Sequence, residues 1–186
     1  MIYYGQATKE DFPDILELQS ENLISNLTPE ERMNGFLTVE FTTQMLDEVI
    51  KEIPIVKAYT DNKLVGYRMA QTIEFNLRFP LLRFIIDRFP NIEFTGQKLS
   101  EYKTFISGPV CIDRDYRGKG VHEGMFSQMI LLVKDQFDIG VTFIAKDNPR
   151  SLKAAIEKLK LTPVDNIHFN EKNYTILAFP TNKQTI

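Results

Sequence analysis

A short run of glycines and cationic side chains, Arg117-Gly118-Lys119-Gly120-Val121, has the clearest chemical potential in the chain. It follows an apolar stretch that ends at Ile112 and precedes a helical pattern, so we expect it to join a strand to a helix. Glycines allow positive φ and a close approach of ligand to backbone. The unpaired N–H groups and the dipole of a helix N-terminus attract anions. Because Arg117 and Lys119 add positive charge, a diphosphate is the expected occupant.

The spacing of this run argues against two other glycine-rich phosphate loops. A nucleoside-triphosphate loop places Ser or Thr after its Gly-Lys pair to bind magnesium, but here Gly120 follows Lys119. This weakens the hypothesis of a nucleotide-phosphate hydrolase. A dinucleotide fingerprint, Gly-x-Gly-x-x-Gly, would begin at Gly118 and require glycine at the position of Glu123.

The run instead resembles the acetyl-CoA-binding motif of the GNAT acyltransferases, which reads Arg/Gln-x-x-Gly-x-Gly/Ala. Residues 117–121 match this motif, and the preceding Tyr116 is also typical of the family. The last motif position is occupied by His122 instead of Gly or Ala, and a further glycine follows at Gly124. The departure at His122 puts the affinity for the cofactor in question, rather than the fold.

A second stretch, Asp147 to Ala155, resembles the family segment in which an Asn and a helix with small residues follow a strand. The resemblance implies that Asn148 and Ser151 contact the pantetheine arm or CoA, although they could equally be a helix cap and a surface residue. The end of this helix resembles the family's Glu-Lys-Leu-Gly-Phe, with Lys160-Leu161 in place of Gly-Phe. The match is specific over residues 104–161.

The resemblance implies a single-domain α/β GNAT-like fold: a mixed, mostly antiparallel sheet with a central, splayed pair of parallel strands, flanked by helices. It also implies direct transfer of an acetyl group from acetyl-CoA, the donor cosubstrate, to an amine of an unidentified acceptor, without a metal. Gly108-Pro109 would be the bulge that opens the strand pair. The implied cofactor-binding residues are Val110, Cys111, Ile112, Arg117, Gly118, Lys119, Gly120, Val121, His122, Asn148 and Ser151.

The family's usual general acid and base have no counterpart here. The helix after Asn148 contains no Tyr, and the strand before the loop contains no Glu. Tyr174 and Glu74 are substitutes to consider, each with a structural role as the alternative. Cys111 lies in an apolar strand, where a buried, inert thiol is expected rather than a nucleophile. A catalytically inactive acyl-CoA-binding sensor or interaction module is the alternative hypothesis.

The expected elements form one domain over residues 1–186. They are a helix over 11–25, a helix over 44–51 capped by Thr43, strands over 53–60 and 64–70 around the turn Asp61-Asn62-Lys63, strands over 105–112 and 141–145, helices over 121–136 and 149–159, and strands over 163–168 and 174–179. The segment 74–103 is predicted to be an insertion that contains a short helix starting at Pro80. It could serve as a pocket wall, a lid or a homodimer contact.

Bulk properties exclude several classes of protein. The net charge of -3 gives no support for nucleic-acid binding. The single cysteine rules out an internal disulfide, and His122 and His168 are too few and scattered for a metal site. No apolar run reaches the roughly 18 residues that a membrane span needs. Without a recognisable signal peptide, a cytoplasmic location is the default expectation.

Overall fold

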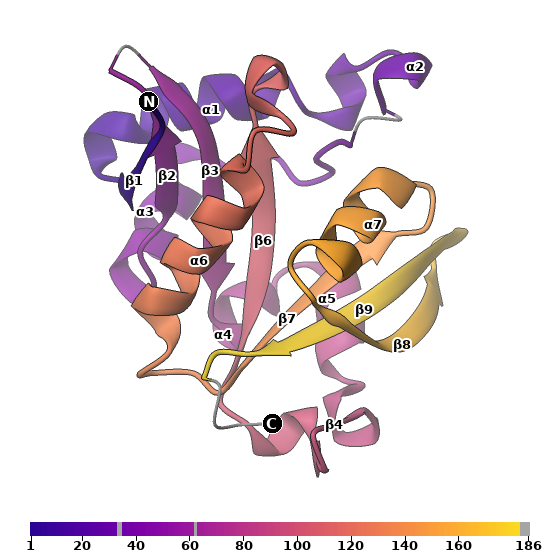
Figure 1. Cartoon of the computed structure of the whole chain (residues 1–186). Helices are drawn as coiled ribbons and strands as arrows, with labels where there is room; N and C mark the ends of the chain where they lie inside the picture. The colour runs from indigo at the N-terminus through magenta and orange to yellow at the C-terminus, as the bar shows by residue number, and fades with distance from the viewer. Residues whose placement is uncertain (33–34, 62, 183–186) are drawn as a thin grey trace. The chain divides into compact units, whose positions relative to one another are not determined.

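The computed structural model describes residues 1–32, 35–61 and 63–182 (Figure 1). Asn62, in the predicted turn 61–63, lies outside the described residues. Contacts within the chain divide it into two compact units, Met1–Ala70 with Gly108–Leu132 and Gln71–Ser107 with Val133–Ile186. Strand β6 (Thr104–Ile112) begins in the second unit and ends in the first, and helix α6 (Val121–Val133) does the reverse.

The first unit contains β1 (Tyr3–Gln6), β2 (Val56–Tyr59), all of β3 (Leu64–Gln71) except its last residue, and the end of β6. The strand order is β1-β2-β3-β6. Strand β2 pairs antiparallel with both β1 and β3, which confirms the predicted hairpin. The first strand of this hairpin starts later than the predicted residue 53. Ile53 is the C-cap of the preceding helix, where its N–H donates to Val49 O, and so cannot yet join the sheet.

Helices pack against both faces of the sheet in the first unit. On one face, Met125 of α6 lies against Gly66 of β3. On the other face, the Cys111 thiol of β6 donates to Leu18 O of helix α1. Figure 1 shows α6 in front of these strands. The helices of this unit are α1 (Phe12–Ser20), α2 (Pro29–Arg32), α3 (Thr43–Glu52) and nearly all of α6.

Two details of these helices correct the sequence-based boundaries. Helix α1 ends at Ser20, short of the predicted residue 25, because Leu23 is extended and forms a parallel bridge with Leu37. The cap of α3 is Thr42 instead of Thr43, since the Thr42 hydroxyl accepts the Met45 N–H. Single-turn 3-10 helices occupy Lys9–Asp11, Ile24–Asn26, Phe89–Asn91, Leu99–Glu101 and Arg114–Tyr116.

The second unit contains the start of β6, β7 (Ile139–Ala145), β9 (Lys172–Pro180) and β8 (Thr162–Phe169), in the order β6-β7-β9-β8. Strands β6 and β7 are parallel, with Thr104, Phe105 and Ile106 opposite Ile139, Gly140 and Val141. The β7–β9 and β8–β9 pairs are antiparallel. The predicted α/β fold, with a mixed, mostly antiparallel sheet and a parallel strand pair, is confirmed.

The predicted insertion, residues 74–103, contributes a helix to the core of the second unit. Helix α5 (Pro80–Ile86) starts at the predicted proline, and its Leu82 and Ile85 are buried with Val141 and Ile176 of the sheet. The same region contains α4 (Ile73–Asn76) and a small hairpin of β4 (Glu93–Phe94) and β5 (Gln97–Lys98). Helix α7 (Pro149–Glu157) follows β7.

Candidate functional site

The predicted strand–loop–helix unit around residues 112–121 is present. Strand β6 ends at Ile112, and α6 begins at Val121. Between them, the Asp113 N–H donates to Val65 O (3.0 Å), and Asp113 Oδ1 accepts the Asp115 N–H (2.9 Å). The loop therefore starts from a point attached to β3, with its first turn capped by a carboxylate.

The two loop glycines adopt the backbone conformation that the sequence predicts. Gly118 has φ +79° and Gly120 has φ +80°, values that L side chains rarely adopt. A Cβ placed on either glycine would have no described protein atom within 4 Å. The backbone is therefore open to a close-fitting ligand at both residues. This geometry fits a diphosphate next to the N-terminus of a helix.

Helix α6 supplies the dipole for such a site. Its first turn is closed by the Gly124 N–H, which donates to Gly120 O (3.0 Å), and the helix continues for 13 residues. The first N–H groups of a helix lie ahead of the repeating backbone hydrogen bonds and carry partial positive charge. An anion beside Gly118 and Gly120 would meet this end of the helix.

The cationic side chains of the loop are largely engaged with the protein itself. Arg117 donates from Nε to Ile112 O (3.1 Å) and from Nη2 to Asn22 Oδ1 (2.6 Å). Arg114 Nη1 pairs with Glu31 (2.7 Å), and Lys119 Nζ lies 5.2 Å from the centre of the Tyr116 ring. Arg114 and Arg117 are thus engaged by protein groups, whereas the side chain of Lys119 is exposed.

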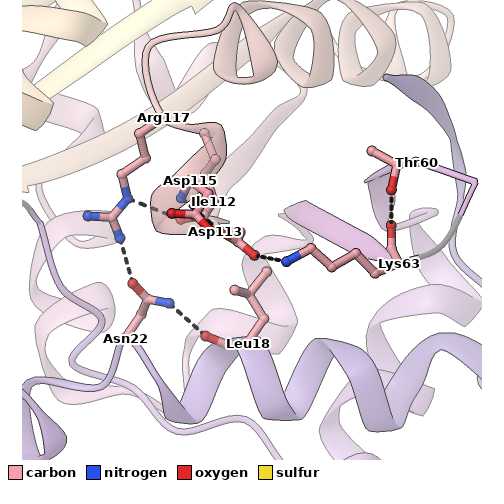
Figure 2. Close-up of polar contacts among 8 residues, drawn as sticks. All are labelled: Leu18, Asn22, Thr60, Lys63, Ile112, Asp113, Asp115 and Arg117. Carbon is pink, nitrogen blue, oxygen red and sulfur yellow. Dashed lines mark hydrogen bonds and ion pairs between the residues drawn. The ribbon is translucent and has the colours of Figure 1, made fainter. Parts of the chain in front are cut away.

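Figure 2 shows how neighbouring elements hold this loop. Asn22, just beyond α1, donates from Nδ2 to Leu18 O (2.8 Å) and accepts from Arg117. Lys63, before β3, pairs with Asp113 Oδ2 (2.6 Å). Burial alone would raise the pKa of Asp113, but the hydrogen bonds from Lys63 and Asp115 and the nearby cations bring it below the usual value. The loop is thus held at Asp113 by the ion pair with Lys63 and at Arg117 by the hydrogen bond to the Asn22 amide.

Strand residues expected to contact the pantetheine arm differ in accessibility. Val110 and Ile112 are half-buried, whereas Cys111 is 4 % exposed. Burial raises the pKa of the Cys111 thiol to about 12, despite the opposing charge of Arg117. The thiol therefore remains protonated near neutral pH and is a poor nucleophile.

Replacement of Cys111 by alanine should leave the rate of any acyl transfer within about threefold of the wild type, because a protonated buried thiol cannot attack a thioester. The cost should fall on stability, about 1 kcal/mol for a small buried side chain. Steady-state kinetics together with a denaturation curve would separate the two effects. A loss of activity by orders of magnitude, with the fold intact, would show covalent catalysis.

His122, which departs from the motif, and Gly124 have different surroundings. His122 is half-buried as the second residue of α6, while Val121 is 1 % exposed. A Cβ on Gly124 would lie only 2.7 Å from Cε1 of Tyr4 and nearer still to the end of that ring. Packing against Tyr4 of β1 therefore explains Gly124, which does not need to take over the role of the missing motif glycine.

Asn148 and Ser151 belong to the second unit and interact with each other. Asn148 Oδ1 accepts the Ser151 N–H (3.2 Å) and caps α7, as expected from the Asn-Pro start of this helix. Asn148 is buried, and Ser151 is half-buried. Both retain polar atoms beyond this bond: the Asn148 amide nitrogen and the Ser151 hydroxyl.

Of the two substitutes for the missing acid and base, Tyr174 lies near this cap. It is the β9 partner of Ala145, the last residue of β7. The centroid of its ring lies 6.0 Å from that of the Phe143 ring. Burial and the negative charge of Asp147 raise the pKa of Tyr174. Its hydroxyl is therefore protonated at neutral pH and suited to donating a proton.

Glu74, the other substitute, lies elsewhere in the second unit. It is an exposed residue of α4 and lines a cavity of about 630 Å³ together with Asp87, Phe89, Tyr102 and Phe137. Much of the cavity wall comes from the inserted segment 74–103. Tyr174 does not line this cavity, so the structure gives the two candidates different surroundings.

Over residues 1–32, 35–61 and 63–182, no three His, Cys, Asp or Glu side chains are grouped so that they could hold a metal ion. In the same ranges, no helix combines the length and apolar character that crossing a bilayer would require.

Comparison with known proteins identifies the fold. The sequence matches no family model and no curated protein. Solved structures that resemble the whole chain include an N-acetyltransferase from Staphylococcus aureus Mu50, at 14% identity and TM-score 0.65, covering 98% of this chain and 99% of that one. The ribosomal-protein-S18-alanine N-acetyltransferase from Escherichia coli has 11% identity and TM-score 0.64, and the match covers 98% of this chain and 95% of that one.

A third similar structure contains the cofactor. It is a candidate acetyltransferase from Salmonella typhimurium with acetyl-CoA, at 14% identity and TM-score 0.65, covering 98% of this chain and 95% of that one. The structural neighbours across the whole chain are thus GNAT N-acetyltransferases, and the chain has the GNAT fold. At the level of the fold, this confirms the resemblance inferred from residues 104–161.

Sequence reasoning missed the residues that hold the loop. Asn22 is 95 positions from Arg117, and Lys63 is 50 positions from Asp113. Neither Asn22 nor Lys63 lies in a motif, and an Asn beyond a helix is an ordinary helix-end residue. The charged Asp113 immediately before the loop was the one local signal, because Asp often caps a turn.

Proposed function

We propose that the protein is an acetyl-CoA-dependent N-acetyltransferase that passes the acetyl group directly to an amine of its acceptor. The proposal is carried by one observation: two glycines at positive φ, with open space beside them, precede helix α6 in a chain with the GNAT fold. The fold match spans 98% of the chain, which supports one functional domain over residues 1–186 that includes the segment 74–103. A cytoplasmic location remains part of the proposal.

The chain's own groups would bind and orient the cofactor. Backbone N–H groups at Gly118, Gly120 and the start of α6 would hold the diphosphate, with Lys119 adding charge. In the first unit, backbone groups of Val110 and Ile112 would bind the pantetheine arm. In the second unit, Asn148 and Ser151 are the residues to which the family resemblance assigns contacts with CoA. Acetyl-CoA supplies an activated acyl group as a thioester. Holding donor and amine together would account for much of the rate.

Proton transfer is assigned to Tyr174, which suits it better than Glu74. Its phenol is protonated at neutral pH, since an ordinary tyrosine pKa is about 10 and burial and Asp147 raise that of Tyr174 further. It lies on β9 opposite the end of β7, three residues before Asn148. A proton donor there would serve the departing thiolate. An amine that arrives as ammonium would lose its proton to water.

Turnover is the test that separates an enzyme from an acyl-CoA-binding sensor. We expect release of free CoA from acetyl-CoA to depend on an added amine, measured over a panel of polyamines, amino acids and peptide N-termini. Tyr174→Phe should lower kcat about 100-fold while leaving acetyl-CoA affinity unchanged, because the ring packing remains and only the proton donor is lost.

Two other outcomes would change the proposal. Tight acetyl-CoA binding without turnover on any amine would favour the sensor, as the missing family acid and base suggest. Turnover unaffected by Tyr174→Phe would remove Tyr174 from the mechanism and leave water or the acceptor itself to supply the proton.

A further inference from the structure

Asn22 has an unusual position for a polar side chain. It is 3 % exposed, and both ends of its amide are used. Its Nδ2 donates to Leu18 O of α1 (2.8 Å), and its Oδ1 accepts from Arg117 Nη2 (2.6 Å). A buried amide that is paired at both its nitrogen and its oxygen is held in one orientation, because a flip would exchange donor and acceptor and break both hydrogen bonds.

Arg117 transmits this fixed orientation to the loop. Its Nε donates to Ile112 O (3.1 Å), the last residue of β6, while its own backbone lies one residue before Gly118. The guanidinium therefore joins the two ends of the segment 112–117 and attaches both to Asn22 (Figure 2). A planar guanidinium with donors in a fixed fork suits this role, since its two bonds define the position of the whole group.

We propose that Asn22 is a positioning residue for the cofactor loop and acts through Arg117, whose guanidinium holds the loop instead of pairing with the diphosphate. The inference rests on the proposed function, because positioning matters only if Gly118 and Gly120 bind a ligand. Asn22 itself touches no ligand. It fixes where the loop leaves β6, and so presets the direction of the backbone N–H groups at the two glycines.

Gln19, near the C-terminal end of α1, provides a matched control. It is 2 % exposed, and its amide is also paired at both ends, with Phe41 O (3.0 Å) and Phe41 N (2.9 Å). Its partner, Phe41, belongs to the segment before α3 and is not part of the loop 113–120. Loss of Gln19 should therefore disturb the packing of α1 to a similar extent while leaving the loop in place.

A double-mutant cycle tests whether Asn22 acts through Arg117. We expect Asn22→Ala and Arg117→Ala each to raise the Kd for acetyl-CoA about 10-fold, and the double variant to match the single ones, since the second change removes an interaction already lost. Gln19→Ala should leave the Kd within about twofold of the wild type. If Asn22→Ala is too unstable to purify, the milder Asn22→Ser takes its place in the cycle.

Amide hydrogen exchange of the ligand-free protein gives a second readout that does not depend on the proposed function. Exchange at residues 113–121 should be at least about 10-fold faster in Asn22→Ala and unchanged in Gln19→Ala. Wild-type protein that fails to bind acetyl-CoA would defeat the proposed function, while exchange would still decide whether Asn22 holds the loop. Equal exchange and equal Kd in the Asn22 and Gln19 variants, or fully additive effects in the cycle, would overturn the inference.

Discussion

Replacement of Gly120 by alanine is expected to weaken acetyl-CoA binding by about 100-fold. Gly120 has φ +80°, and its Cβ would enter the open space where the diphosphate is proposed to lie. The added methyl group and a shifted backbone would together remove about two charge-assisted hydrogen bonds, each of about 1.5 kcal/mol, which corresponds to roughly two orders of magnitude in Kd. Isothermal titration of each variant with acetyl-CoA measures the effect. Gly120→Glu should abolish binding, because a carboxylate would also repel the diphosphate.

Gly96 supplies the matched control for this substitution. It has φ +87°, and a Cβ there would also have no described atom within 4 Å, but it lies in the turn between β4 and β5. Gly96→Ala should therefore carry the same backbone strain, about 1 kcal/mol, without a change in acetyl-CoA affinity. Equal affinities for the two variants would mean that the loop at Gly120 is an ordinary turn.

The largest expected effect on stability is at Gly140 in β7. A Cβ on this buried glycine would lie 2.8 Å from Cζ of Phe105 and closer still to the ring of Phe179. Those two rings pack edge-on at 5.9 Å, and their residues are the β6 and β9 partners of Gly140. Gly140→Ala should therefore lower the free energy of unfolding by about 3 kcal/mol, the upper part of the range for overpacked cores. Chemical denaturation measures the change.

Gly5 and Phe179 supply controls for the effect at Gly140. A Cβ on Gly5 of β1 would make an ordinary 3.7 Å contact with Tyr59, so Gly5→Ala should change stability by less than about 1 kcal/mol. Adding Phe179→Leu to Gly140→Ala should recover part of the loss, because a smaller side chain makes room for the methyl group. Gly140→Ala protein as stable as the Gly5 variant would show that the rings are not packed over Gly140.

The parts of the structure that depend on local pattern were predictable. The strand, glycine turn and apolar helix around residues 110–133 follow from signals within about 20 residues, and so does the start of α7 at Asn148-Pro149. Gly118 and Gly120 have the positive φ that their place in the loop required. The helix start at Pro80 was also local, because proline suits the first turn of a helix.

Interactions between distant residues were not predictable. From the sequence, Arg117 beside two glycines is expected to be a phosphate ligand. Only its hydrogen bonds to Ile112 and Asn22 show that the guanidinium is engaged by the protein. Gly140 lies just before the predicted strand 141–145, and nothing in the sequence indicates that the rings of Phe105 and Phe179 pack over it. A single sequence does not specify which distant side chain will fill a neighbouring space.

The departure at Lys160 has a visible structural consequence. Where the family sequence has glycine after Glu-Lys-Leu, Lys160 adopts φ +60° beyond the end of α7. The helix end therefore keeps the left-handed conformation that favours glycine, although a lysine occupies it. The geometry is preserved at the expense of about 1 kcal/mol of backbone strain. Substitution at a motif position can thus leave the fold unchanged, and the same applies to the side chain of His122.

Calorimetric titration of the wild-type protein with acetyl-CoA, and separately with ATP, is the most direct test of the proposed cofactor site. We expect acetyl-CoA to bind with a Kd in the micromolar range, roughly -8 kcal/mol, and ATP with magnesium not to bind, since no hydroxyl follows Lys119. Absence of acetyl-CoA binding would show that the loop of Gly118 and Gly120, despite its conformation, is not a cofactor site, and magnesium-dependent ATP binding would move the protein to a different functional class.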